Sequence, residues 1–391
     1  MSRYHSYINT AKTIIDQYKG QEPLAVFLKQ FFATNKKYGS KDRKQIGSLC
    51  YDYYRVAHGL PAAMEKDDQL LLATLLCEHQ FSNLLQDLRP EWNQIIWEPE
   101  AIKMTAAGEN FKTEKLFPLT AELSDGIDAT AFAASFLHQP KFFLRLRPGY
   151  EKIAQAKLSA LAVPYERIND QCLALPNGTK LDEEILIDKE VVVQDYNSQQ
   201  VGEVIRPFLT NAQSPITIWD CCAASGGKSI MLFDIDKKIR FTVSDIRSSI
   251  LHNLQNRFQR AGLQQYQSFV ADLAENGAEL SAAQKFNFIV ADVPCTGSGT
   301  WARTPEQLYY FRKELIAPFA LRQQKIVSNV VPHIAAGGYL IYITCSVFKK
   351  ENECIVEYIQ QHHALQLRAM KLLEGYRRFA DTMFVAVLQK S

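Results

Sequence analysis

The 391-residue sequence lacks any apolar run that approaches the roughly 20 residues needed to cross a bilayer. Its first residues, MSRYHSYINTAK, are polar and lack the apolar core of a secretory signal. No repeat of fixed period is evident, and 18 glycines and 15 prolines exclude a collagenous or low-complexity chain. We therefore expect a soluble, cytoplasmic, multidomain protein with no membrane partner.

The eight cysteines are scattered, and none belongs to a C-x-x-C pair. This spacing disfavours a zinc site and dithiol redox chemistry, so we expect reduced thiols and no metal. Five of the cysteines are interpreted as packing residues: Cys50, Cys77, Cys172, Cys221 and Cys354.

The chain also lacks a large excess of charge of either sign, because 44 basic residues are nearly balanced by 42 acidic ones. The basic residues are unevenly distributed, however. Residues 29–44 contain six Lys or Arg and one Asp, and residues 140–152 place Arg145 and Arg147 among aromatic residues. Such mixtures suit nucleic acid, although a solvent-exposed helix face explains either segment equally well by itself.

The length predicts two or three domains, and the apolar pattern changes twice along the chain. Early apolar residues recur at helical spacing, as in Tyr7, Ile8, Ala11 and Ile14, which predicts a helical domain over residues 1–138. Residues 139–190 combine strand-like FFLRLRP and CLALP with helix-like EKIAQAKLSALA, which indicates a small α/β domain.

From residue 191 to 391, short apolar runs alternate with helix-length segments. The runs are PITIWD, RFTVSD, YQSFVADL, FNFIVADVPC and GGYLIYITC. This alternation is typical of an α/β fold with a doubly wound, Rossmann-like parallel sheet, in which helices cover both faces.

Ligands of such sheets bind at the carboxyl ends of the strands, and four runs end near an aspartate: Asp220, Asp245, Asp272 and Asp292. The first is followed by CCAASGGKS, a loop of small residues that opens a helix and allows close backbone approach. Its glycine pair could be only a tight turn, but the three further aspartates weaken that interpretation.

Cys222 occupies the first glycine position of a P-loop, and G-x-G-x-x-G is absent, so an adenosine-bearing cofactor other than NAD or FAD is favoured.

Two cysteines, Cys295 and Cys345, follow strand-like runs at the same predicted edge. A lone cysteine there is usually a small buried apolar residue. If the two strands are neighbours, however, both thiols would lie beside the group that the cofactor transfers.

In this order, DCCAASGGKS, VSDIR, ADL, ADVPCTGSGTWARTPE and GGYLIYITCSVFKKENE resemble the motifs of the Sun-type RNA (cytosine-5) methyltransferases, the Sun/NOL family. VQDYNSQQ resembles that family's QD-x-x-SQ segment, so the resemblance covers the chain from about residue 190 onward. Upstream, KDRKQIGSLCYDYYRV resembles more loosely the NusB-like domain of the bacterial ribosomal-RNA members, and QPKFFLRLRP resembles the start of their small RRM-like RNA-binding subdomain.

The resemblance implies a class I S-adenosyl-L-methionine-dependent methyltransferase domain that forms 5-methylcytidine, with 16S ribosomal RNA as the favoured partner and a monomeric enzyme. It also implies that Cys345 is the nucleophile, that Cys295 acts in product release, and that Asp292 binds the base edge with Lys228 nearby. The expected cofactor pocket comprises Cys222, Ala223, Ala224, Ser225, Gly226, Gly227, Lys228, Asp245, Asp272 and Asp292.

The chemistry explains why cysteines are needed. Carbon 5 of cytosine becomes nucleophilic only after a thiolate adds to carbon 6. A thiol with a pKa near 8.5 needs a field that favours its anion, which Lys228 could supply, although an ordinary lysine at a helix start is an equal alternative. DNA cytosine-5 methyltransferases use the cysteine of a proline-cysteine motif, so residue types alone leave the choice between Cys295 and Cys345 open. The target base must be single-stranded or flipped out.

The sequence departs from the family pattern at three places. Ser225 stands where the family usually has proline, Ala302 replaces one arginine, and the C-terminal Asp-Gly-Phe-Phe reads Asp381-Thr382-Met383-Phe384. The last two bear on the choice of RNA. The alternatives are a tRNA cytosine-5 methyltransferase, transfer to a nitrogen or to a protein side chain, and a non-catalytic RNA-binding assembly factor.

Overall fold

The computed structural model describes residues 2–107, 111–212, 215–275, 280–281 and 283–391. The contacts divide this part of the chain into two compact units. The first comprises the residues up to Ala121 together with Asp128–Gln139 and Trp301–Lys313, and the second comprises Glu122–Ile127, Pro140–Thr300 and Glu314–Ser391. The three-domain division at residues 138 and 190 stays a prediction.

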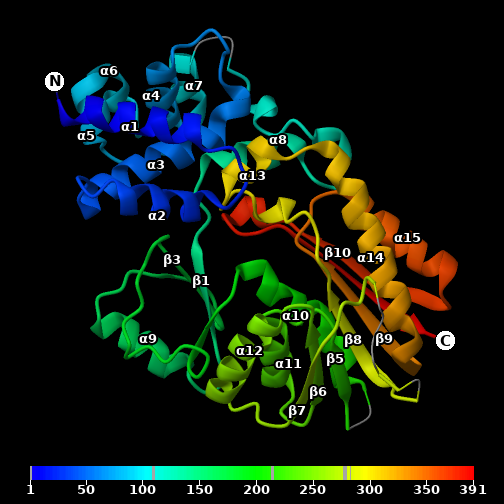
Figure 1. Ribbon diagram of the computed structural model, residues 1–391. Coiled ribbons are helices and arrows are strands. Elements are labelled where there is room, and N and C mark those ends of the chain that lie inside the picture. The colour runs from blue at the N-terminus through cyan, green and yellow to red at the C-terminus, as the bar shows by residue number, and fades with distance from the viewer. Residues whose placement is uncertain (1, 108–110, 213–214, 276–279, 282) are drawn as a thin grey trace. The chain divides into compact units, whose positions relative to one another are not determined.

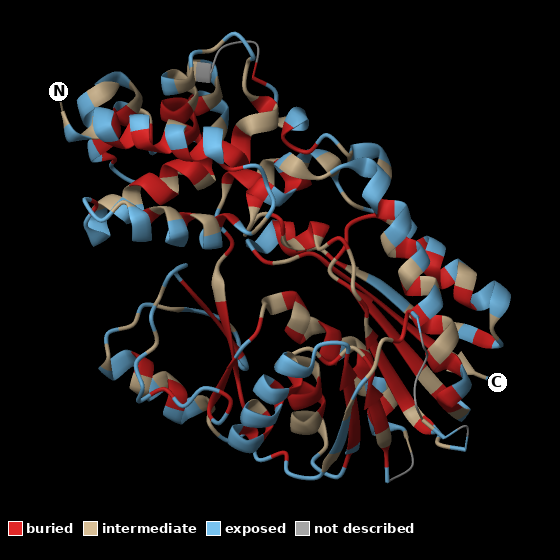
Figure 2. Cartoon of the chain, viewed as in Figure 1, coloured by how far each residue is buried: buried red, intermediate tan, exposed pale blue. Residues whose placement is uncertain are grey.

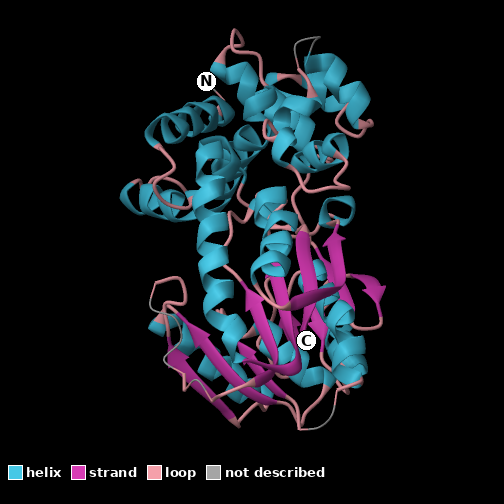
Figure 3. Cartoon of the chain, turned by 90° about the vertical axis from the view of Figure 1, so that its right-hand side faces the viewer, coloured by secondary structure: helices cyan, strands magenta, loops and turns pink. Residues whose placement is uncertain are grey.

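The described residues of the first unit form helices and loops (Figure 3). Tyr7, Ile8, Ala11 and Ile14 are buried, so the helical pattern read from the N-terminal sequence is confirmed. The helices are α1 (Arg3–Gln17), α2 (Leu24–Thr34), α3 (Ser40–Val56), α4 (Lys66–Cys77), α5 (Asn83–Leu88), α6 (Pro90–Gln94), α7 (Glu100–Ala107), α8 (Ala129–Ala134) and α13 (Pro305–Tyr310).

The segment Trp301–Lys313 belongs to this helical unit although it follows the proline-cysteine motif in the sequence. The Tyr310 hydroxyl donates a hydrogen bond of 2.7 Å to the Tyr18 carbonyl. The Arg55 guanidinium donates one of 2.8 Å to the Ala302 carbonyl. Long-range contacts of this kind have no local sequence signal.

The second unit contains a small antiparallel sheet of order β2-β3-β1-β4. Helix α9 packs on it, with Ala154 and Leu158 in one apolar cluster with Leu144 and Leu173. The elements are β1 (Phe142–Leu146), α9 (Glu151–Ala160), β2 (Glu166–Asn169), β3 (Cys172–Leu175) and β4 (Val191–Val193).

Arg145 and Arg147 do not serve the role expected for them. Neither lies on an exposed nucleic-acid-binding surface or on a solvated helix face, because both are buried and pair with Asp234 at 2.7 Å. A buried carboxylate offsets the cost of burying cations, and it comes from a distant helix. The basic residues of segment 29–44, by contrast, are exposed on and between α2 and α3.

The larger sheet of the second unit has the strand order β10-β11-β9-β8-β5-β6-β7 (Figure 1). Its β5 to β9 neighbours pair in parallel, and β11 pairs antiparallel with both β9 and β10. The predicted doubly wound α/β fold is confirmed. The strands are β5 (Thr217–Asp220), β6 (Arg240–Asp245), β7 (Tyr266–Val270), β8 (Phe286–Asp292), β9 (Ile334–Thr344), β10 (Leu365–Leu373) and β11 (Met383–Lys390).

Helices cover both faces of this sheet. Alternate strand residues face opposite sides, so Ile218 and Ile341 pack with α10, α11 and α12, whereas Trp219 and Tyr342 pack with α14 and α15. The central strands are therefore buried on both faces (Figure 2). These helices are α10 (Tyr196–Thr210), α11 (Gly227–Ile235), α12 (Ser248–Ala261), α14 (Ile316–Val330) and α15 (Glu353–His362).

Short 3-10 helices connect several of these elements. They are Ala57–Gly59, Thr113–Leu116, Thr120–Glu122, Ser135–Leu137, Ser298–Thr300, Lys313–Leu315, Val331–His333, Lys349–Glu351 and Gly375–Arg378. Within the described residues, no helix combines the length and the apolar composition that a membrane span requires.

Candidate active site

A cavity of about 600 Å³ opens at the carboxyl ends of the parallel strands, a size typical of small-molecule sites. Most of the predicted site residues line it: Cys222, Ala224, Asp245, Asp272, Asp292, Cys295 and Cys345. Five other predicted residues are absent from its lining: Ala223, Ser225, Gly226, Gly227 and Lys228. The sequence analysis missed apolar and basic lining residues that include Ile246, Arg247, Leu273, Pro294, Arg322 and Ile326.

The loop after β5 has a constrained backbone. Gly226 has a φ of +80°, and a Cβ atom there would lie 2.4 Å from the Phe258 ring, so only glycine fits. Gly227 has open space around the corresponding position and is not required in the same way. Ala224 also lies in the left-handed region, with a φ of +46°.

Asp245 at the end of β6 is buried and connects to that loop. One carboxylate oxygen accepts a hydrogen bond of 3.0 Å from the Ala224 backbone N–H, and the other accepts one of 3.0 Å from the Arg247 N–H. The Arg247 Nε–H also donates to that second oxygen, at 3.1 Å, so the oxygen that Ala224 bonds is the one with acceptor capacity left for a ligand hydroxyl. With the carboxylate of Asp272 and the apolar side chains of Ile246 and Leu273, the lining fits a ribose and a flat base.

Lys228 and Asp292 form an ion pair behind the cavity wall. Lys228 Nζ lies 2.8 Å from Asp292 Oδ2 and 3.0 Å from the Ser198 hydroxyl. Burial by itself would lower the pKa of Lys228, but the Asp292 carboxylate, with the charges of Asp220 and Cys345, outweighs burial, and the pKa is raised. Lys228 is thus a fixed cation that acts on the cavity through Asp292.

The two cysteines lie together because their strands are neighbours. Strands β8 and β9 pair in parallel with Asp292 opposite Ile343, and each cysteine follows its strand within three residues. The Sγ atoms of Cys295 and Cys345 are 3.4 Å apart, and both residues line the cavity. The hydrogen bond to Cys345, together with burial, raises the pKa of Cys295 well above that of an ordinary thiol.

Glu351 is a residue of this site that sequence reasoning did not single out. Its buried carboxylate accepts hydrogen bonds of 2.9 Å from the Thr296 backbone N–H and the Gln323 amide, and further bonds from the hydroxyls of Thr296 and Ser346. Thr296 and Ser346 each directly follow a cysteine. Glu351 therefore ties the two cysteine loops together, and its place in the KKENE motif was the only available signal.

A third segment joins these loops at Gly299. The Gly299 N–H donates to the Cys345 carbonyl at 2.8 Å, and the Thr382 N–H donates to the Gly299 carbonyl at 3.0 Å. A Cβ atom on Gly299 would lie 2.1 Å from the Thr382 carbonyl oxygen. The altered motif that contains Thr382 is thus part of the framework of the cysteine loops.

Residues 208–385, which include the cofactor loop and both cysteines, match the family model described as 16S rRNA methyltransferase RsmB/F. This part of the chain is thus similar to the RsmB/F methyltransferases. The match confirms the resemblance that the sequence motifs suggested.

Curated relatives of the RsmB type agree with that match over part of their length. The probable ribosomal RNA small subunit methyltransferase B of Bacillus subtilis is 28% identical over 214 residues, which cover 54% of this chain and 46% of the relative. The ribosomal RNA small subunit methyltransferase B of Proteus mirabilis is 30% identical over 162 residues, or 41% and 37% of the two chains. The chain spans about half the length, or less, of these two relatives.

Solved structures share the fold of this chain. A crystal structure of PH0851 superposes with a TM-score of 0.68 at 16% identity, covering 98% of this chain and 97% of that one. NSun6 from Pyrococcus horikoshii superposes with a TM-score of 0.56 at 14% identity, covering 67% and 94%.

Proposed function

We propose that the chain is an S-adenosyl-L-methionine-dependent RNA methyltransferase that forms 5-methylcytidine in 16S ribosomal RNA through a covalent adduct between Cys345 and carbon 6 of the base. The pair of thiols 3.4 Å apart at the cavity carries this proposal. The RsmB/F match and the relatives named for small-subunit ribosomal RNA support the choice of substrate.

The cavity residues would hold the cofactor by its adenosine part. Asp245 would accept hydrogen bonds from the ribose hydroxyls, and Ile246 and Leu273 would pack against the base. When bound, S-adenosylmethionine supplies an electrophilic methyl group on a sulfonium. Asp292 and the two cysteines lie at the same cavity, where the target base would meet that methyl group.

Cys345 is proposed as the nucleophile. Its thiolate would add to carbon 6 of cytosine, and the ring electron pair would move to carbon 5, which would take up the methyl group as the methyl–sulfur bond breaks and the cofactor leaves as a neutral thioether. The negative charge of Cys345 is one of the causes of the raised pKa of Lys228, so the two groups lie close enough to attract each other. Because the raised pKa of Cys295 keeps that residue a neutral thiol near pH 7, it is the less suitable attacking group.

Cys295 is proposed to act in release. After methyl transfer, the carbon 5 proton leaves to a base, the carbon 6–sulfur bond breaks, and the double bond of the ring is restored. The largest cause of the raised pKa of Cys295 is its hydrogen bond to Cys345, a bond that weakens once the Cys345 sulfur is bound to carbon. With that bond weakened, Cys295 would release its own proton to solvent and then, as a thiolate, accept the proton from carbon 5, while Asp292 binds the base edge near N3.

The exposed basic segment 29–44 is proposed to contact RNA phosphates. Its cations lie beside aromatic rings: Lys37 is 5.0 Å from the centre of the Tyr38 ring, and Arg43 is 5.9 Å from that of Phe32. The two rings are buried, so the segment offers exposed cations for phosphates rather than aromatic rings for stacking. A target cytosine in a duplex would first have to be flipped out.

The test is transfer of labelled methyl from S-adenosylmethionine to naked 16S RNA, small ribosomal subunits and tRNA, all taken from a strain that lacks the enzyme. We expect label in 5-methylcytidine of 16S RNA with the wild type, none with Cys345→Ala, and a trapped protein–RNA adduct with Cys295→Ala. Label in a nitrogen-methylated nucleoside or in protein, or full activity of Cys345→Ala, would refute the mechanism. Label confined to tRNA would refute the proposed substrate, and cofactor binding with no transfer to any RNA would point to an assembly factor.

A further inference from the structure

The cofactor loop after β5 holds a backbone shape that it would not adopt unaided. Ala224 and Gly226, on either side of Ser225, have φ values of +46° and +80°. Glycine takes such values freely, but alanine is strained there. A strained residue of this kind persists only where its surroundings hold it in place.

Two side chains outside the loop hold it. Asp245, on one side, accepts the hydrogen bond from the Ala224 N–H already described. On the other side, Arg257 of α12 donates from Nη1 to the Ser225 carbonyl at 3.0 Å and to the Ser225 hydroxyl at 2.7 Å. Arg257 therefore fixes both the backbone and the side chain of the residue next to the strained alanine.

Arg257 is itself held by Asp188, which lies in the turn before β4 of the small sheet. The Asp188 side chain is 1% exposed, and one of its oxygens accepts from Arg257 Nε at 2.9 Å. The other oxygen accepts from Arg260 Nη2 at 2.8 Å. Of these two arginines, Arg257 is the one that bonds Ser225 in the described structure, and this makes Arg260 a natural control.

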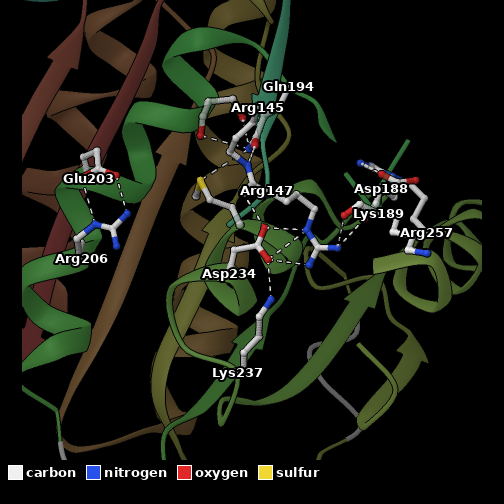
Figure 4. Close-up of polar contacts among 12 residues, drawn as sticks. Arg145, Arg147, Asp188, Lys189, Gln194, Glu203, Arg206, Asp234, Lys237 and Arg257 are labelled. Atoms are coloured by element: carbon white, nitrogen blue, oxygen red, sulfur yellow. Dashed lines mark hydrogen bonds and ion pairs between the residues drawn. The ribbon is translucent and has the colours of Figure 1, made fainter. Parts of the chain in front are cut away.

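Arg147, which lies just after β1, anchors the turn that carries Asp188 (Figure 4). Arg147 Nη1 donates to the Asp188 carbonyl at 2.7 Å, while its Nη2 pairs with Asp234 of α11 at 2.7 Å. Helix α11, which follows the cofactor loop, is thus linked to the small sheet. Arg257, which holds the loop, is linked to the same sheet.

We propose that Arg257, oriented by Asp188, is a positioning residue that keeps the cofactor loop in its binding conformation, so that the small four-stranded sheet sets the affinity for S-adenosylmethionine. The inference rests on the proposed function, because it assigns the cavity to that cofactor. Without the bridge, Ala224 can relax from the left-handed region, and its N–H moves away from Asp245, the carboxylate proposed to bind the ribose. The cysteine loops after β8 and β9 make no bond to Arg257 among the described contacts, so the chemical step is left intact.

The experiment is a calorimetric titration of the full chain with S-adenosylhomocysteine, without RNA. We expect Arg257→Gln to raise Kd about tenfold. Arg257→Lys should raise Kd nearly as much, because one ammonium group cannot replace the planar guanidinium that bonds Asp188 and Ser225 at the same time. The matched control Arg260→Gln removes the other arginine of Asp188 and should leave Kd unchanged. In the methyl-transfer assay, KM for the cofactor should rise for Arg257→Gln while kcat at saturation is retained.

Equal Kd values for Arg257→Gln and the wild type would overturn the inference, as would an equal weakening by Arg260→Gln. If Arg257→Gln does not fold, Arg257→Lys decides, since it keeps a cation beside Asp188 but cannot bond Asp188 and Ser225 together. Weaker binding by that variant at an unchanged Tm supports the bridge, and unchanged binding refutes it. A wild-type chain that binds no cofactor would instead refute the proposed function itself.

Discussion

The sulfur atoms of Cys295 and Cys345 lie 3.4 Å apart although 50 residues separate them in the chain. Their proximity follows from the parallel pairing of β8 with β9, which brings the ends of both strands to one edge of the sheet. The chain between the two strands includes Trp301–Lys313, which packs with the helical unit.

A mild oxidant such as diamide should therefore join the two thiols, since a disulfide needs an S–S distance of about 2.05 Å and the sulfurs start close to it. We expect a Cys295–Cys345 disulfide in peptide mass spectra and loss of methyl transfer, both reversed by dithiothreitol. Cys295→Ser should form no such link. Oxidative inactivation with both thiols still free would contradict the prediction.

Replacing Lys228 by Met should lower kcat by about 100-fold, because a fixed cation that stabilises negative charge at the site is lost. Its bond to Asp292, at 2.8 Å, would be lost as well. Lys228→Arg, which keeps the charge, should retain more activity. Single-turnover formation of the protein–RNA adduct is the measurement, with the exposed Lys238→Met as control. A Lys228→Met enzyme with wild-type adduct rates would remove Lys228 from the mechanism.

Glu351→Gln should loosen both cysteine loops. An amide keeps one acceptor oxygen but cannot accept the hydrogen bonds that reach the other carboxylate oxygen, and an unsatisfied buried group costs about 1–3 kcal/mol. We expect a lower Tm, a lower kcat, and a smaller yield of the Cys295–Cys345 disulfide. Glu357→Gln, at an exposed position of α15, should change none of the three. Full disulfide yield in Glu351→Gln would show that the loops keep their register without it.

Asp220 predicts a specific pH dependence of stability. Burial raises the pKa of Asp220 from 3.8 to about 7, so between these values the folded chain holds a proton that the unfolded chain has released. The contribution of Asp220 is therefore fully present below pH 4 and is lost as pH rises through about 7. Asp220→Asn should lack this loss, so its Tm relative to the wild type should increase from pH 4.5 to 8. A constant difference across that range would show that Asp220 does not titrate there.

Exposed cations of segment 29–44 should make RNA binding depend on salt. Raising salt from about 50 to 200 mM should weaken binding at least tenfold if several phosphates are contacted. The double variant Lys36→Ala/Lys37→Ala should reduce both the affinity and the salt slope, measured by fluorescence anisotropy with a 16S RNA fragment. Lys238→Ala serves as the control for lost charge. A flat salt response of the wild type would rule out the proposed basic surface.

Much of the fold and the site composition could be predicted because the relevant signals are local. Runs such as FNFIVADVPC have the length and residue types of buried strands, and their order along the chain predicts a parallel sheet. The carboxyl ends of parallel strands meet at one edge, so Asp245, Asp292, Cys295 and Cys345 were placed together before any coordinates. All four line the cavity.

The sequence by itself thus determined which strands form, where their carboxyl ends meet, and several of the side chains that line the cavity there. Only the tertiary structure decided the contacts whose partners lie far apart in the chain. Asp234 forms an ion pair with the buried Arg145, which lies 89 residues away in the chain. Arg257 donates a hydrogen bond to Ser225, which lies 32 residues away. Such contacts depend on how the helices pack on the sheets, and no local periodicity encodes the partner of a polar side chain. From the sequence alone, an arginine in a strand-like run is therefore predicted to be exposed. Only the structure reveals the carboxylate that pairs with it in the interior.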